Sequence, residues 1–108
     1  MATNELHGKQ ARLVDLIAVQ PGAIVSKTLI ERRTGTITLF AFDRGQKLSE
    51  HTAPFDALAM TLQGSVDIIL DGVHHTLTAG DAIVMPGGVV HAVDAMEPCN
   101  WLLTMIRS

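Results

Sequence analysis

Residues 80–91, GDAIVMPGGVVH, decide the fold that this sequence predicts. The segment Ala82–Met85 is short and apolar, and the turn-forming run Pro-Gly-Gly follows it directly. The next apolar segment, Val89–Val93, carries His91. Short apolar segments separated by Gly and Pro are typical of β-strands joined by tight turns. This stretch therefore predicts two strands and the turn between them.

The same pattern of short apolar segments continues through most of the chain. From Ala23 onward such segments recur about every ten residues and end at Gly, Pro or Asp, which is typical of an all-β sandwich or barrel. The pair Asp71-Gly72 predicts a two-residue hairpin turn, because both central residues must adopt positive φ, which Asp and Gly tolerate. The predicted strands are Ala23–Arg33, Gly35–Asp43, Lys47–Thr52, Ala57–Leu62, Ser65–Leu70, Val73–Thr78, Ala82–Met85, Val89–Val93 and Asn100–Arg107.

One domain accounts for all 108 residues, since a single core usually forms at roughly 100 to 150 residues. Residues 1–22 differ from the rest, because their apolar side chains between Leu6 and Ile17 have a loose helical spacing. The Pro-Gly pair at the end of this segment stops the pattern. We therefore predict an N-terminal arm or single helix over residues 1–22, lying on a barrel formed by residues 23–108.

The composition favours a folded, cytoplasmic protein. Hydrophobic residues make up 47% and charged residues 18% of the chain, which is typical of globular domains. The net charge of −3 predicts no basic surface for nucleic acid. The longest strictly apolar runs, of which Ala57–Met60 is one, have four residues, far below the roughly 20 of a membrane-spanning helix. Because Cys99 is single and the polar first residues lack a signal-peptide core, we expect a cytoplasmic location.

Two predicted strands lack a polar face. In Asn100–Arg107 apolar residues occupy both alternating sets, and in Ala57–Gln63 the set Leu58, Met60 and Leu62 is wholly apolar. Only one face of each sheet can look into the core, so the second apolar face needs another cover. We expect a homodimer to provide that cover, with the N-terminal arm as the alternative.

Two blocks of the sequence resemble the motifs of the cupins, which are small double-stranded β-helix, or jelly-roll, barrels. The first block is Gly45–Gly64, which has both end glycines and His51 at the family's spacing. The second block is Gly80–His91, which matches the family's Gly, Pro, Gly and His at every position. The resemblance covers about Gly45–Ala95, and it implies an all-β jelly-roll cupin barrel with a short N-terminal arm.

In cupins the two blocks together supply four metal ligands, and the resemblance carries over only two of them, His51 and His91. Ala53 stands at the family's second His position, and Ala57 stands at its Glu position. A divalent zinc, nickel, manganese or iron ion would therefore need water, a bound ligand or the neighbouring Asp56 to complete its shell. Strand alternation directs Asp56 to the other face unless a bulge intervenes.

Small side chains take the place of the lost ligands, so the resemblance implies a roomier and less polar lumen. Such a lumen suits a small, partly apolar ligand that a few polar groups orient. The residues expected around it are His51, His91, Ala53, Ala57, Ala59, Thr61 and Gln63, with Phe40, Phe42, Trp101 and Met105 as candidate wall residues. For each aromatic residue singly, ordinary core packing is an equal alternative.

Several functions are compatible with these residues. The leading one is a small-molecule-binding cupin, with a degraded metal site around His51 and His91. The main alternative is a metal-dependent cupin enzyme of oxygenase or isomerase type with an atypical two-His site. A ligand sensor that acts with a separately encoded partner, and two histidines that serve only the barrel structure, are further alternatives. The sequence decides neither the ligand nor whether the chain is an enzyme.

Overall fold

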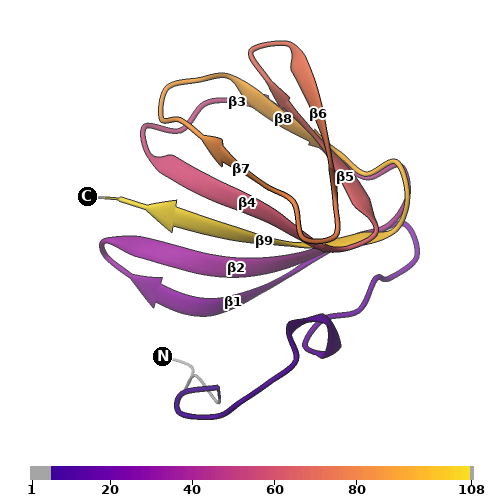
Figure 1. Ribbon diagram of the computed structural model, residues 1–108, viewed down its shortest axis with the longest axis vertical. Helices are drawn as coiled ribbons and strands as arrows, with labels where there is room; N and C mark the ends of the chain where they lie inside the picture. The colour runs from indigo at the N-terminus through magenta and orange to yellow at the C-terminus, as the bar shows by residue number, and fades with distance from the viewer. Residues whose placement is uncertain (1–5, 108) are drawn as a thin grey trace.

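Residues 6–107, which the computed structural model describes, form two antiparallel β-sheets that face each other (Figure 1). One sheet has the strand order β1-β2-β9-β4-β7, and the other has the order β3-β8-β5-β6. The strands are β1 (Ile24–Arg32), β2 (Gly35–Phe42), β3 (Lys47–His51), β4 (Asp56–Gln63), β5 (Ser65–Leu70), β6 (Val73–Thr78), β7 (Ala82–Met85), β8 (His91–Asp94) and β9 (Cys99–Ile106). The predicted all-β jelly-roll barrel is confirmed.

Local turn chemistry explains most strand boundaries. Asp71 and Gly72 both have positive φ, 48° and 79°, and join β5 to β6 in the predicted two-residue hairpin. The predicted strand Val89–Val93 is the main difference, because β8 begins only at His91. The reason is that the preceding turn takes up Val89, whose N–H donates a hydrogen bond to the Pro86 carbonyl oxygen at 3.3 Å.

The core between the sheets is built around three aromatic side chains. Phe40 stacks on Trp101 with ring centroids 4.7 Å apart, and Phe42 meets Trp101 edge-on at 5.6 Å. Apolar residues of the other sheet, including Val66 and Ile68, pack against them and are fully buried. Burial of such large side chains is the main favourable contribution to folding.

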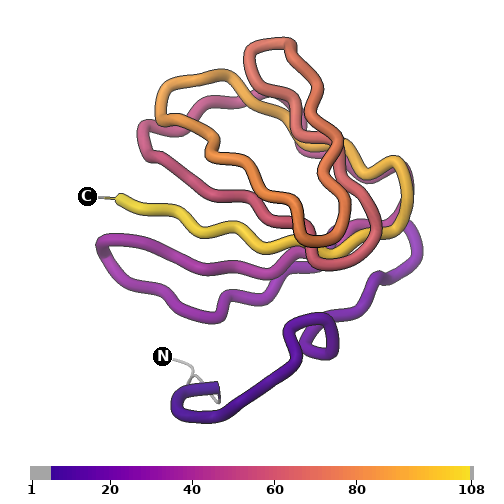
Figure 2. The backbone as a smooth tube through the Cα atoms, in the orientation of Figure 1, coloured from indigo at the N-terminus to yellow at the C-terminus, as the bar shows by residue number. Residues whose placement is uncertain are grey.

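The N-terminal arm contains only a three-residue 3-10 helix, η1 (Leu13–Asp15), in place of a longer helix. Figure 2 shows the arm running back past the β1–β2 hairpin. Its Ile17 is buried against Leu39 and Ala41 on the outer face of the five-stranded sheet. The arm therefore covers part of the second apolar face. No helix among residues 6–107 is long and apolar enough to cross a membrane.

A carboxylate fixes the junction between the arm and the barrel. Asp43, just after β2, accepts hydrogen bonds from the N–H groups of Gly22, at 2.7 Å, and Arg44, at 2.8 Å. These two bonds hold the pKa of Asp43 below its ordinary value, since they stabilise the charged form. The arm is thus held at its C-terminal end as well as by its apolar side chains.

We expect the thiol of Cys99 to be unreactive in the folded protein. Cys99 is 2% exposed, and burial together with the charge of Glu97 raises its pKa to about 11. Because the thiolate is the reactive form, Ellman's reagent at mildly alkaline pH should leave the native thiol intact and label it rapidly in guanidinium. Complete labelling of the native protein within the mixing time would contradict the predicted burial.

Candidate functional site

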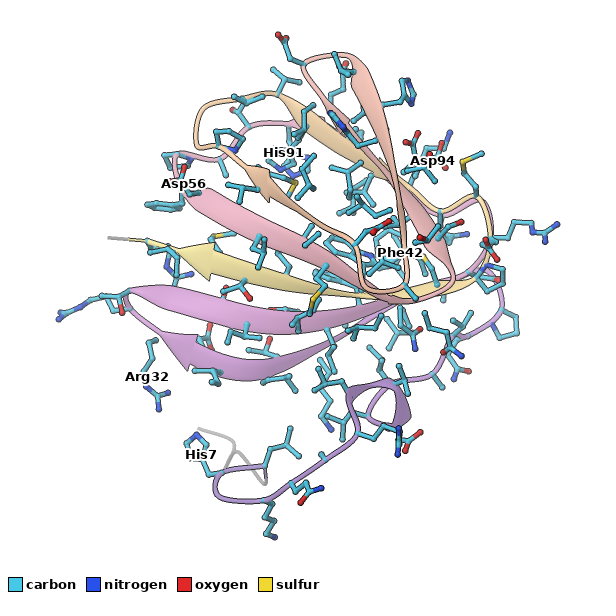
Figure 3. All side chains as sticks on the ribbon, in the orientation of Figure 1. His7, Arg32, Phe42, Asp56, His91 and Asp94 are labelled. Atoms are coloured by element: carbon cyan, nitrogen blue, oxygen red, sulfur yellow. The ribbon has the colours of Figure 1, made fainter. Side chains whose placement is uncertain are left out.

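His51 and His91 lie side by side at one end of the barrel. They are cross-strand partners on β3 and β8, and their ring centroids are 4.1 Å apart with an interplanar angle of 66°. Cross-strand partners share a face of the sheet. His91 alternates with the core residue Val93, so the pair lies on the inner face, and Figure 3 shows His91 directed between the two sheets.

A bulge in β3 creates this pairing. Lys47 and Leu48 pair with Asp94 and Val93, and the register then shifts before His51 meets His91. Without this shift, continuous antiparallel pairing would place Glu50 opposite His91. The two cupin blocks therefore bring their histidines together only because β3 accommodates one more residue than β8.

Backbone carbonyl groups determine the tautomer of both rings. The Nδ1 of His51 lies 2.7 Å from the carbonyl oxygen of Ser49, and the Nδ1 of His91 lies 3.2 Å from that of Val89. A carbonyl oxygen only accepts, so each Nδ1 must carry the proton. In the neutral rings both Nε2 atoms then bear a lone pair, available for a hydrogen-bond donor, a proton or a metal ion.

The motif turns, which are Ala53–Phe55 of the first block and Pro86–Gly88 of the second, contact each other beside this pair. Asp56 takes part in that contact. The carboxylate of Asp56 accepts a hydrogen bond from the Gly87 N–H at 2.8 Å, and the Gly88 N–H donates to the Ala53 carbonyl at 2.7 Å. A side chain at Gly87 would approach the Pro54 carbonyl oxygen to 2.7 Å. These contacts explain the glycine at position 87, which is not one of the family's motif glycines.

Asp56 lies on the outer face of β4, as strand alternation predicts. It pairs with Ile106 of β9 and borders an outer hollow together with Leu58 and Val84. Its carboxylate is therefore engaged outside the lumen. Among residues 6–107, no group of three or more His, Cys, Asp or Glu side chains lies close enough to hold a metal ion. The two imidazoles are fewer than the three protein ligands of a usual catalytic metal site, so water or a bound molecule would have to complete the shell of any metal ion held there.

The predicted alanine row lies on the inner face of β4. Ala57 pairs with Met85 and Met105, and it is 8% exposed. Further along the strand Thr61 pairs with Trp101, and both are fully buried in the core together with Phe40. The structure thus places Ala57 at the end of the strand next to the motif turns and Thr61 deep between the sheets.

Gln63 does not continue this row. A second register shift, between Thr61 and Gln63, sets Gln63 opposite Asn100, whose side-chain Nδ2 lies 3.4 Å from the Gln63 Oε1. Asn100 alternates with the core residues Cys99 and Trp101 and so faces outward. The expectation that Gln63 lines the lumen is not met, because the bulge reverses the alternation on which it rested.

One polar pair outside the predicted site escaped the sequence reasoning. Asp67 on β5 is 6% exposed, and its Oδ2 lies 2.6 Å from the Nδ1 of His74 on β6. Its Oδ1 has no hydrogen-bond partner among the described residues. The position of Asp67 between the apolar residues Val66 and Ile68 indicates that its side chain lies on the outer face of β5. That His74 is its partner follows only from the register of the β5–β6 hairpin.

Two facing antiparallel sheets with paired imidazoles at one end define a jelly-roll barrel with a candidate polar site. The chain belongs to the cupin family, because the family model described as "Cupin domain" matches residues 38–105. The resemblance of the two sequence blocks is therefore confirmed. No curated protein matches the sequence.

Solved structures agree with this membership. A conserved protein of unknown function from Streptococcus pyogenes is 32% identical, with a TM-score of 0.92 over 98% of this chain and 93% of that chain. A cupin superfamily protein from Desulfitobacterium hafniense is 26% identical, with a TM-score of 0.86 over 92% and 94% of the two chains. A cupin 2 conserved barrel domain protein from Leptotrichia buccalis is 32% identical, with a TM-score of 0.83, and the match covers 86% of this chain but 45% of that chain.

Proposed function

We propose that this cupin binds a small, partly apolar organic molecule at the end of the barrel where His51 and His91 lie. The observation that carries the proposal is the tautomer of the two rings. Each Nδ1–H is directed to a backbone carbonyl, so each Nε2 is left as an acceptor. Such a pair favours a ligand that offers hydroxyl or amino donors, or an acidic proton.

The neighbouring side chains favour a partly apolar ligand. Ala57 is small where the family's pattern has a carboxylate, and the side chains of Met85 and Met105 flank it on the adjacent strands. Methionine is flexible and polarisable, and it adapts to irregular apolar groups. The same end of the barrel therefore combines two polar acceptors with apolar surroundings. A site of this composition orients a ligand through the imidazoles and holds the rest of it by apolar contact.

The second candidate function is that of a metal-dependent cupin enzyme with a two-His site. It is favoured by the same lone pairs, since neutral imidazole nitrogen is a common ligand of zinc, nickel and iron. Water or substrate atoms would have to supply the remaining donors. Elemental analysis of protein purified without a His tag separates the two candidates, because the enzyme requires a stoichiometric metal and the binding protein does not.

We expect ligand binding to depend on both histidines. A panel of small phenols, hydroxy acids and amines, screened by thermal shift, should contain compounds that stabilise the wild-type protein. A ligand at one hundred times its Kd stabilises by about 2.7 kcal/mol. His51→Ala and His91→Ala should each abolish this shift, whereas His7→Ala, on the exposed part of the arm, should retain it. Shifts that survive both substitutions would place the binding site elsewhere.

A further inference from the structure

His74 and His75 are neighbours on β6, and the register of the β5–β6 hairpin directs their side chains to opposite faces of the four-stranded sheet. His74 lies on the outer face, where it is bonded to Asp67. His75 is the cross-strand partner of Ile68, which is fully buried in the core, so the His75 imidazole lies on the inner face. The inner face of this sheet therefore carries a third imidazole besides the pair of the candidate site.

The ring of His75 has no bonding partner within the described part of the chain. His75 is half-buried, and neither of its ring nitrogens forms a hydrogen bond or ion pair with another residue of the range 6–107. By contrast, the rings of His51, His74 and His91 are each held by a backbone carbonyl or a carboxylate. A half-buried polar ring gains free energy from a bound partner. Because β6 is an edge strand (Figure 1), no strand among residues 6–107 pairs with its free side and supplies that partner.

One registered row of inner-facing residues connects the imidazole pair with this part of β6. Its members are direct cross-strand partners on β3, β8, β5 and β6, in the order His51, His91, Leu70 and Val73. Leu70 is half-buried, and Val73 is 57% exposed. His75 follows Val73 by two positions and so shares its face. The result is a short apolar surface with imidazoles at both ends.

The spacing of the strands sets the length of a molecule that could contact both ends of this surface. β8 and β6 are two strand spacings apart, and His75 lies two residues along β6 from the row of His91, so their Cα atoms are about 12 Å apart. Since inner-facing side chains project in the same direction, the rings keep about this spacing. A hydrogen bond at each end then leaves roughly 6 Å between the two polar atoms of the molecule. Oxygen atoms on opposite sides of a para-disubstituted aromatic ring have about this separation.

We propose that His75 is a third polar contact of the ligand site, and that the ligand is a small molecule with polar groups at both ends of an apolar body. One end, a hydroxyl or amino group, donates to the Nε2 atoms of His51 and His91, and the other end bonds to His75. The apolar body lies over Leu70 and Val73. This inference rests on the binding function proposed above, and it adds the class of ligand.

The inner faces of β5, β6 and β8 offer such a molecule no other side-chain polar group. Apart from His75 and His91, their inner-facing residues are apolar, and the most deeply placed of them, Val66, Ile68 and Val93, are fully buried. Hydrogen bonds from these strands' side chains therefore come from the imidazoles alone. A molecule with one polar group leaves one end of the surface unbonded, so a molecule with two should bind more tightly.

Two probe molecules that differ by one hydroxyl group test the role of His75. Para-hydroxybenzyl alcohol carries a polar group at both ends of its ring, and para-cresol carries only one. In titration calorimetry the wild-type protein should bind the alcohol about three- to tenfold more tightly, the gain expected from one hydrogen bond. His75→Phe keeps a ring and removes both nitrogens. It should bind para-cresol at least as tightly as the wild type, which also shows that it is folded, and lose the preference for the alcohol.

The neighbouring histidine provides the matched control. His74→Gln changes the adjacent residue of the same strand on the outer face, and its amide can still donate to Asp67. It should retain the full preference for the alcohol. Equal affinity of the wild-type protein for the two molecules, or a preference that survives His75→Phe, would overturn the role of His75. Failure of the wild type to bind either molecule would instead overturn the binding function on which this inference rests.

Discussion

The double substitution Ala53→His with Ala57→Glu is expected to tighten the binding of Zn²⁺ by about a hundredfold or more. Each change adds a donor where the structure holds only His51 and His91. Ala57 already lies on the inner face of β4 beside Met85 and Met105, so a carboxylate there is directed inward. Titration calorimetry with Zn²⁺ on the wild-type and doubly substituted proteins measures the difference.

The matched control for the donors is Ala53→Leu with Ala57→Leu, which adds side-chain volume at both positions and no ligand atom. It should bind Zn²⁺ as weakly as the wild type. Tight stoichiometric binding by the unmodified protein would contradict the expectation, and it would favour the two-His enzyme over the binding protein. A folded double variant without improved binding would show that the imidazole pair does not share an ion.

Gly64→Ala is expected to destabilise the fold by about 3 kcal/mol, which corresponds to a fall in Tm of roughly 10–20 °C. Gly64 has a φ of +75° in the turn from β4 to β5, a conformation that costs other residues about 1 kcal/mol or more. A Cβ at this position would also lie 2.3 Å from the Pro98 carbonyl oxygen and 3.1 Å from the Cys99 Cα. Backbone atoms must therefore move, and thermal or urea unfolding measures the cost.

Gly72→Ala separates the two contributions to this cost. Gly72 has a similar φ of +79°, but no heavy atom of residues 6–107 beyond its chain neighbours lies within 4 Å of a Cβ built there. It should lose only the conformational part, about 1 kcal/mol. Equal losses in the two variants would show that the contact of Gly64 with the β9 entry does not constrain the fold.

Much of the fold follows from local signals in the sequence. Alternating apolar residues and the turn chemistry of Asp71-Gly72 place the strands, and the spacing of the two blocks identifies the cupin barrel. The start of β8 differs from the prediction because Val89 and Val90 have strand-like side chains. The Val89 N–H instead closes the turn onto the Pro86 carbonyl oxygen, and the Val90 carbonyl oxygen accepts from Asp71 in the β5–β6 turn. Backbone hydrogen bonds, which carry no side-chain signal, accompany that boundary.

The sequence predicted that His51 and His91 lie close together, but it predicted less about the groups that surround them. The motif spacing brings His51 and His91 together, but the carbonyl groups of Ser49 and Val89 that set their tautomers carry no side-chain signal. The bulge before Gln63 changes the face of that residue without any Gly or Pro to announce it. The apolar residues on the outer face of the five-stranded sheet predicted that another part of the molecule or a second copy would cover them. The sequence did not predict which of these residues the arm itself covers, because that depends on where the arm packs on the sheet.

The bulge before His51 has a consequence for how such a barrel can change over evolution. The pairing of the two imidazoles needs the extra residue because His51 follows Leu48 by three positions, whereas His91 precedes Val93 by two. Loss of Ser49 or Glu50 would shorten the first interval to two, so β3 could pair continuously with β8 and still place His51 opposite His91. A single codon deletion in this segment could thus remove the bulge while the imidazole pair at this end of the barrel is retained.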